Sequence, residues 1–190
     1  TITPNELILI DSRKNKSILK EINQIFDNKK TSIIYENINL PRVKALNYAI
    51  SKANCDYLIR FDSRTRFSTT YAEEALKLLQ QKNKFRMVLG AVGGRQTCYQ
   101  ANESNKAKLA SDLMDRAYLF GNPLYRRRNY SGEVNSIYLG CFPKSILKET
   151  PYRDEISLIS EDSQLSQDII SKGYKIHISQ NLILKYICRD

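Results

Sequence analysis

Three places in the sequence carry acidic side chains where they could take part in chemistry. Asp11 follows the apolar run LILI at 7–10, and Asp62 follows the run YLIRF at 57–61. Both runs are typical of buried strands, so these carboxylates are expected at strand ends. Glu161 and Asp162 open a segment with helical apolar spacing. Carboxylate oxygens are ligands for Mg²⁺ or Mn²⁺, and an Asp within reach of a hydroxyl group can remove its proton.

Each of these acids also has an ordinary structural explanation. An Asp at a strand end can start or cap a turn, and this alternative is open for Asp11 and Asp62. Acidic residues in the first turn of a helix interact favourably with the helix dipole, which is an alternative for Glu161 and Asp162. Residue type and spacing alone leave both explanations open.

The elements that must position these acids alternate between strand and helix in the first half of the chain. Strands are expected at 7–10, 32–35, 57–61 and 87–92, and helices at 17–26, 46–53 and 71–79. This order predicts an α/β fold of three layers (α/β/α), with a mostly parallel sheet flanked by helices. Ligands of such sheets bind outside the C-terminal ends of the strands, which is where Asp11 and Asp62 are expected.

The second half of the chain is less regular. A helix is expected at 110–117, a loop at 120–132 and a strand at 134–142. A second helix is expected after Ser160, ending at Gly173, and the runs KIHIS and ILKYI are expected to form the terminal strands. The sequence contains no linker, repeat or low-complexity segment, so residues 1–190 are expected to form a single domain.

The chain is basic, with 30 Lys and Arg against 20 Asp and Glu and a net charge of +10. This charge favours nucleic acid, phosphorylated small molecules or an anionic membrane as partners. The sequence shows no helix-turn-helix, RRM or KH signature and no interleaving of aromatic and basic residues. No apolar run approaches the ~18 residues of a membrane span, and no N-terminal signal peptide is recognisable. The cluster Arg126–Arg128 could bind membrane or lipid-linked phosphates, or it could be a solvated loop.

Cysteine and histidine are too sparse for several kinds of catalysis. Cys55, Cys98, Cys141 and Cys188 lie far apart, which indicates reduced, mostly buried thiols in a cytosolic protein. His177 lies in an alternating run and is expected to be half-exposed on a strand. A single histidine in that setting disfavours Ser-His-Asp or Cys-His catalysis and histidine-rich metal sites.

Five segments in order resemble the family 2 glycosyltransferases of the GT-A fold, and most closely the branch of the succinoglycan-type glucosyltransferases. They cover nearly the whole chain: ELILIDSRKNKS (6–17), LPRVKALNYAISKANCDYLIRFDSRTRF (40–67), VGGRQ (92–96), FGNPLYRRRNYSGEVNSIYLGCFPKSIL (120–147) and SEDSQLSQDIISKGYKI (160–176).

The resemblance implies a GT-A-like (Rossmann-like) domain that moves a sugar, with inversion, from a nucleotide diphosphate sugar to a glycan or lipid-linked acceptor in polysaccharide biosynthesis. It assigns the general base to Asp162 and the orientation of the acceptor or its loop to Glu161. It implies a cytoplasmic protein at the inner face of the membrane. The implied nucleotide-sugar site consists of Asp11, Arg42, Asp62, Arg64, Gly93 and Gly94.

Within that implied site, Asp62 would ligate Mn²⁺ or Mg²⁺, and Asp11 would accept a hydrogen bond from the donor base. Arg64 would touch the diphosphate, unless it is a solvated surface residue. Gly93 and Gly94 would form a tight turn or allow the backbone to approach the ligand closely.

Two features depart from the family pattern. Family members begin with a further strand and helix, so either this chain is a fragment or that strand is missing, which would expose a buried strand edge. The family motif Asp-x-Asp, or Asp-x-His in the branch, is here Asp62-Ser63-Arg64, and an arginine cannot bind a metal. These departures leave open an inactive glycosyltransferase fragment, and the net charge of +10 leaves open a basic α/β module that binds nucleic acid.

Overall fold

A computed structural model of the chain describes residues 2–12, 17–26, 30–81, 88–100, 102–116, 121, 123–127, 129–154 and 161–188. Its elements follow in the order β1 (Glu6–Ile10), α1 (Ser17–Ile25), β2 (Ser32–Glu36), α2 (Arg42–Lys52), β3 (Tyr57–Ile59), β4 (Thr65–Phe67), α3 (Tyr71–Gln80), β5 (Leu89–Tyr99), α4 (Asn105–Met114), the 3₁₀ turn η2 (Leu124–Arg126), β6 (Gly132–Glu133), β7 (Cys141–Pro143), α5 (Lys144–Glu149), α6 (Glu161–Ser171) and β8 (Lys175–Ile187).

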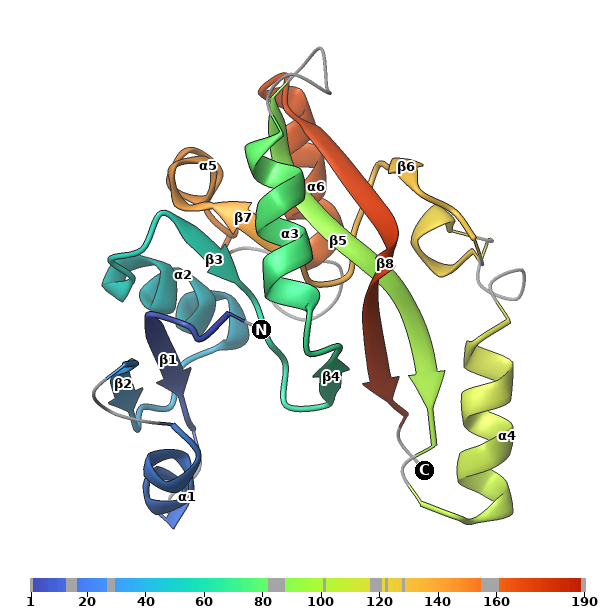
Figure 1. The fold of residues 1–190 in the computed structure, drawn as a ribbon, viewed down its shortest axis with the longest axis horizontal. Helices are drawn as coiled ribbons and strands as arrows, with labels where there is room; N and C mark the ends of the chain where they lie inside the picture. The colour runs from blue at the N-terminus through green and yellow to red at the C-terminus, as the bar shows by residue number, and fades with distance from the viewer. Residues whose placement is uncertain are drawn as a thin grey trace.

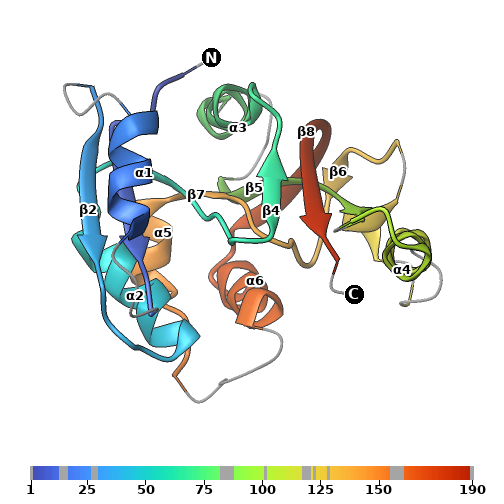
Figure 2. The same cartoon turned by 90° about the horizontal axis from the view of Figure 1, so that it is seen from below.

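Helices cover both faces of a six-stranded sheet, which confirms the predicted three-layer α/β/α architecture (Figures 1 and 2). On one face, α3 packs Tyr71 and Ala75 against a buried cluster that includes Val92 and Leu184. On the other face, residues of α2, α5 and α6 pack against the inner sides of β5 and β8. The start of α6 and the end of β3 belong to the same region of this second face, where the candidate site lies.

The sheet is mixed, so the prediction of a mostly parallel sheet was wrong. The strand order is β3-β7-β5-β8-β4, with β6 paired to β8. Within this sheet β5 and β8 are parallel, whereas β3 with β7, β5 with β7, β4 with β8 and β6 with β8 are antiparallel. The prediction rested on the alternation of strands and helices. The short antiparallel strands β4 and β6 were missing from that alternation because two or three residues have no detectable periodicity.

Strand β1 pairs with β2 in a separate two-stranded parallel sheet. The start of β1 lies beside the segment before β3, because the Glu6 carboxylate accepts hydrogen bonds from the backbone N–H groups of Asn54 and Cys55, at 2.8 and 3.2 Å. All five residues of β1 are only half-buried, whereas the apolar run predicted burial on both faces. In the described part of the chain, β1 pairs with β2 on one side only. It is therefore an edge strand, and its side chains are less covered than those of a central strand. The same holds for β3, which among the described strands pairs only with β7.

The Gly93–Gly94 pair lies inside β5, so the first of the two predicted roles, a tight turn, was wrong. A Cβ atom on Gly94 would lie 1.6 Å from the carbonyl oxygen of Leu182 on β8, and one on Gly93 would lie 3.2 Å from that of Leu139. Glycine is therefore required at position 94, where backbone packs against backbone, whereas a side chain at position 93 would need the Leu139 carbonyl to shift slightly.

The predicted strand at 134–142 forms only at its end, as β7. Leu139 has a positive φ of 57°, although it is a leucine and 1 % exposed. This conformation is costly for a bulky residue and interrupts an extended strand. The two predicted C-terminal strands are instead one long strand, β8.

Several residues outside the acidic motifs lie where the sequence placed them. His177 is half-buried on β8, opposite Glu133 of β6. Cys141 and Cys188 are buried, Cys55 and Cys98 are half-buried, and all four are free thiols. Over the residues that the structure describes, no helix is long and apolar enough to cross a membrane.

The arginine cluster does not form one exposed patch in the described residues. The Arg126 guanidinium donates a hydrogen bond to the Met114 carbonyl of α4 at 2.9 Å, whereas Arg127 is exposed. Arg128 lies outside the described residues, as does Ser160, the predicted helix cap.

Candidate active site

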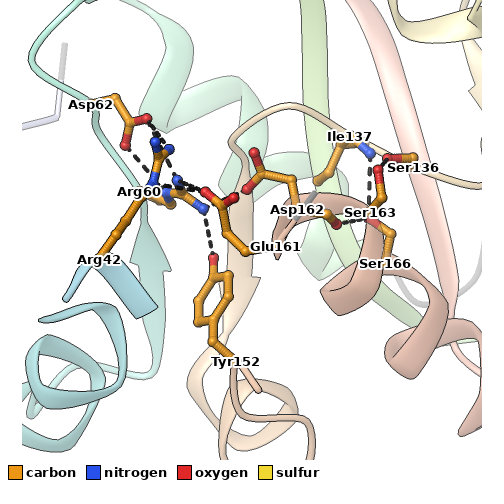
Figure 3. Close-up of polar contacts among 10 residues, drawn as sticks. All are labelled: Arg42, Arg60, Asp62, Ser136, Ile137, Tyr152, Glu161, Asp162, Ser163 and Ser166. Atoms are coloured by element: carbon orange, nitrogen blue, oxygen red, sulfur yellow. Dashed lines mark hydrogen bonds and ion pairs between the residues drawn. The ribbon is translucent and has the colours of Figure 1, made fainter. Parts of the chain in front are cut away.

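Three of the predicted site acids converge on one arginine that sequence analysis did not select (Figure 3). Arg60 follows β3 directly, and its side chain is only 7 % exposed. Its guanidinium pairs with Asp62, with Glu161 at 2.9 Å and with Asp162. Asp62 is two residues further along the chain, whereas Glu161 and Asp162 are about a hundred residues away, so tertiary folding brings the two predicted motifs together.

A tight turn between β3 and β4 presents Asp62. The Thr65 backbone N–H donates to the Asp62 carbonyl at 2.9 Å, and the Thr65 hydroxyl group donates to the same oxygen at 2.6 Å. The turn is thus closed by bonds from Thr65 to the backbone carbonyl of Asp62. The Asp62 carboxylate points to the guanidinium groups instead. The observed geometry thus argues against a purely turn-capping role for the Asp62 carboxylate.

Glu161 and Asp162 occupy the first turn of α6, as predicted. Glu161 is 8 % exposed and accepts bonds from both Arg60 and Arg42. Buried acids paired with guanidinium groups differ from solvated acids that merely complement a helix dipole. The helix therefore orients both carboxylates toward the end of β3.

Arg42, the first residue of α2, closes the cluster on its exposed side. Its Nη2 lies 2.7 Å from Asp62 Oδ2, and its Nε lies 2.8 Å from Glu161 Oε1. Arg42 is 52 % exposed, so it is the guanidinium of this cluster that a ligand can reach directly.

Burial makes Asp162 the acid with the most perturbed titration. Removal from solvent raises its pKa from an ordinary value of 3.8 to about 6, although the positive charge of Arg60 acts in the opposite direction. Burial also acts to raise the pKa of Glu161, but the hydrogen bond from Arg60 and the charges of Arg42 and Arg60 outweigh it and lower that pKa. Two neighbouring carboxyls with diverging pKa values are typical of an acid–base site.

The raised pKa of Asp162 predicts that stability falls as the pH rises from about 4 to about 6. In this range the folded state binds more protons than the unfolded chain, so the free energy of unfolding decreases with increasing pH. Each unit of pKa difference corresponds to about 1.4 kcal/mol. The free energy of unfolding, measured with denaturant at several pH values in this range, should fall less steeply with pH for Asp162→Asn than for the unaltered chain. Identical pH dependence in the two would contradict the assignment.

Two tyrosines that the sequence did not single out interact with the cluster, Tyr152 through a hydrogen bond and Tyr138 through the charges of its acids. The hydroxyl group of Tyr152 accepts a hydrogen bond from Arg60 Nη1 at 3.2 Å. Burial, together with the charges of Asp62 and Asp162, raises the pKa of Tyr138. The Tyr138 ring packs edge-on against that of Tyr186, with 5.9 Å between the ring centroids. A local sequence signal existed for Arg60, because a charge inside the apolar run YLIRF must find partners if the run is buried. The tyrosines had no comparable signal.

Of the remaining predicted site residues, Arg64 is two positions along the chain from Asp62, whereas Asp11 follows β1 and Gly93 and Gly94 lie in β5. Asp11 is 7 % exposed, and its carboxylate accepts a 3.3 Å hydrogen bond from the hydroxyl group of Tyr35 on β2. Asp11 and Asp62 therefore follow strands of two different sheets, and the expectation that both lie at the C-terminal edge of one sheet was wrong. Arg64 is exposed beside Asp62. Gly93 and Gly94 lie inside β5, and their part in nucleotide-sugar binding stays a prediction.

Asp62 is the residue that could hold a divalent cation. Its side chain is 23 % exposed, and both of its oxygens face guanidinium groups, Oδ2 that of the accessible Arg42 and Oδ1 that of Arg60. The described residues contain no group of three or more His, Cys, Asp or Glu side chains suited to a metal. Mg²⁺ is usually held by one or two carboxylates together with substrate phosphates, so a single Asp fits a cation that arrives with a diphosphate.

Comparison with solved structures identifies the fold. The crystal structure of GalNAc-T7 with UDP, GalNAc and Mn²⁺ matches with a TM-score of 0.68 and 13 % identity, over 97 % of this chain and 38 % of that chain. TarS 1–349 of S. aureus matches with a TM-score of 0.64 and 9 % identity, over 96 % of this chain and 51 % of that one. A second TarS structure matches with the same TM-score and 10 % identity, over 96 % and 31 %.

The fold is therefore that of the GT-A glycosyltransferases, and this chain spans about a third to a half of the length of these neighbours. The model of the Glycosyl transferase family 2 matches residues 1–150. The chain belongs to glycosyl transferase family 2. No curated protein sequence matches it.

Proposed function

We propose that this chain is a hexosyltransferase that moves a sugar, with inversion, from a nucleoside diphosphate sugar to a glycan or lipid-linked acceptor in polysaccharide biosynthesis. The observation that carries the proposal is the convergence of Asp62 and Asp162 on Arg60. Through Arg60, the Asp62 carboxylate, which suits the diphosphate side of the reaction, is held near the buried carboxyl group of Asp162, which suits the acceptor side. The fold and the family support transfer of a glycosyl group.

In the proposed reaction, Asp162 is the general base. Its ionised carboxylate takes the proton of an acceptor hydroxyl group while that oxygen attacks the anomeric carbon of the donor sugar. The bond between the anomeric carbon and the diphosphate oxygen breaks, and the nucleoside diphosphate leaves with the electron pair. A carboxyl that titrates at about 6 is largely ionised at neutral pH and still basic enough to accept a proton.

On the donor side, the proposal assigns Arg42 and Arg64 to the diphosphate. Guanidinium groups pair well with phosphate oxygens, and both side chains are solvent-accessible. Glu161 holds Arg42 through a 2.8 Å ion pair and thereby directs its guanidinium to the site. Asp11 is assigned to the donor base, as an acceptor for a ring N–H.

Asp62 would hold Mn²⁺ or Mg²⁺, which, when bound, would offset the charge that develops on the leaving diphosphate. The proposal also retains membership of the succinoglycan-type branch and a cytoplasmic location at the inner face of the membrane. The acceptor is a glycan or lipid-linked saccharide, and nucleic acid is not a partner.

Thermal shift measurements with UDP, GDP and dTDP, each with and without Mn²⁺, test the proposal. One nucleoside diphosphate is expected to raise Tm, and more so with the cation, because a ligand that binds only the folded state stabilises it. Release of that nucleoside diphosphate from its sugar conjugates, in the presence of saccharide acceptors, then measures transfer.

Oligonucleotide binding at several salt concentrations is the competing arm of the experiment. A steep salt dependence of oligonucleotide binding, with no Tm response to any nucleoside diphosphate, would overturn the proposal in favour of a nucleic-acid-binding module. A Tm response without turnover would indicate a domain that binds the donor but is inactive.

A further inference from the structure

The Arg60 guanidinium uses its full set of hydrogen-bond donors inside the site. Nε donates to Asp62 Oδ1 at 3.3 Å, and Nη2 donates to Glu161 at 2.9 Å and to Asp62 Oδ2 at 3.5 Å. Nη1 donates to Asp162 and to the hydroxyl group of Tyr152. An arginine has five N–H donors in a planar fork, and here each of them has an acceptor. No other described guanidinium contacts all three carboxylates.

The surrounding residues hold this guanidinium from behind. The Tyr152 ring lies under it, with 5.5 Å between the ring centroid and Cζ. Asn47 of α2 fixes Tyr152 through two backbone contacts, at 2.7 and 3.0 Å. The Arg60 backbone N–H donates to the Gly140 carbonyl at 3.1 Å. Arg60 is thus a fixed cation, in contrast to the half-exposed Arg42.

Without this cation the three carboxylates would repel one another in a partly buried site. Breaking a buried ion pair by removing one partner leaves an uncompensated charge. The charged groups that act on Asp162 are Arg60 at the end of β3, Arg42 on α2, Glu161 on α6 and Asp62 in the turn. Tyr138 and Tyr152 also lie in its electrostatic surroundings.

We propose that Arg60 is a positioning residue for sugar transfer, which fixes the donor-side Asp62 and the acceptor-side Glu161 and Asp162 in one arrangement. The inference rests on the proposed function and adds to it a residue that links the donor-side carboxylate to the acceptor-side carboxylates. A lysine cannot replace this arginine, because an ammonium group lacks the planar fork that addresses three carboxylates and a hydroxyl group together.

The test compares Arg60→Lys and Arg60→Ala with the unaltered chain, and uses Arg153→Lys as a matched control. Arg153 is 52 % exposed and pairs with Asp168 on the outer side of α6, so the control should keep parent kinetics. For Arg60→Lys, kcat should fall by about 10²-fold, because a misplacement of about 1 Å costs that much. The donor KM should change less than kcat, since Arg42 still pairs with Asp62.

Two further readouts separate positioning from a merely structural effect. In Arg60→Ala, the acidic limb of the kcat profile should move to higher pH, because the Arg60 charge no longer favours ionised Asp162. Added guanidinium ion, well below denaturing concentration, should restore part of the activity of Arg60→Ala, whereas sodium should not. Tyr152→Phe, which keeps the ring but removes one acceptor, should show a smaller loss in the same direction.

The outcomes distinguish this inference from the proposed function. If the unaltered chain transfers no sugar from any donor, the proposed function itself fails. If it is active and folded Arg60→Lys or Tyr152→Phe matches Arg153→Lys in kcat and pH profile, the positioning role is wrong. A double-mutant cycle of Arg60→Lys and Asp162→Asn in kcat should show strong non-additivity, and additive losses would also overturn the inference.

Discussion

Asp162→Asn is expected to lower turnover by about 10²–10⁴-fold with little change in donor affinity, the loss expected when a general base is removed. Asparagine keeps the size of the side chain and an oxygen that can accept the bond from Arg60. It cannot take the proton of the acceptor hydroxyl group. Initial rates at saturating donor and acceptor measure the effect, and calorimetric titration of the nucleoside diphosphate measures donor affinity.

Asp168→Asn is the matched control for this substitution. Asp168 lies on the same helix, beyond its first turn, and both of its carboxylate oxygens accept bonds from the exposed Arg153. Arg153 is 52 % exposed, and asparagine keeps an acceptor oxygen for it, so this variant should be nearly normal in rate and only slightly less stable. If Asp162→Asn turned over as fast as Asp168→Asn, the base would have to be sought elsewhere, first at Glu161.

Asp62→Asn is expected to remove most of the cation-dependent part of donor binding. The nucleoside diphosphate should bind about 100-fold more weakly in the presence of Mn²⁺, since loss of an outer-shell partner alone typically costs 10–100-fold in metal affinity. Asparagine keeps one acceptor oxygen, for either Arg42 or Arg60. The turn is closed by Thr65 on the backbone carbonyl of Asp62, so its fold should survive. Without Mn²⁺ the variant and the unaltered chain should bind the nucleotide similarly.

Asp56→Asn provides the comparison for the Asp62 experiment. Asp56 is exposed and precedes β3, whereas Asp62 follows the same strand. The control should leave nucleotide affinity unchanged under both conditions. If Asp62→Asn also left the affinity unchanged with and without Mn²⁺, the diphosphate would be met by Arg42 and Arg64 and not by a cation at Asp62.

Local sequence patterns predicted most elements correctly. The spacing of apolar residues located α1, α2, α3 and α6, and the runs LILI and SIIY located β1 and β2. These predictions succeed because helix and strand periodicity reflect which face of an element is buried. The short strands β4 and β6 were missed, because two or three residues contain too little periodicity.

The direction and partners of the strands depended on the tertiary structure. Nothing in VNSIYLGCF indicates that its last residues run antiparallel between β3 and β5, or that Leu139 takes a left-handed conformation. The Gly93–Gly94 pair indicated a close approach, but the neighbour is the backbone of β8 and of the Leu139 segment. Such contacts join residues far apart in the chain.

The sequence by itself determined which acids are available for chemistry, because Asp62 must follow a short apolar strand and Glu161 and Asp162 must open a helix. The tertiary structure decided which of them meet. It separated Asp11 from Asp62 by ending their strands in different sheets, and it brought α6 to the end of β3. In the sequence, Arg60 is one charged residue at the end of an apolar strand. In the folded chain it is the buried partner of three carboxylates. The stabilisation of a buried charge comes from partners such as Glu161 and Asp162, which only the tertiary structure brings within reach.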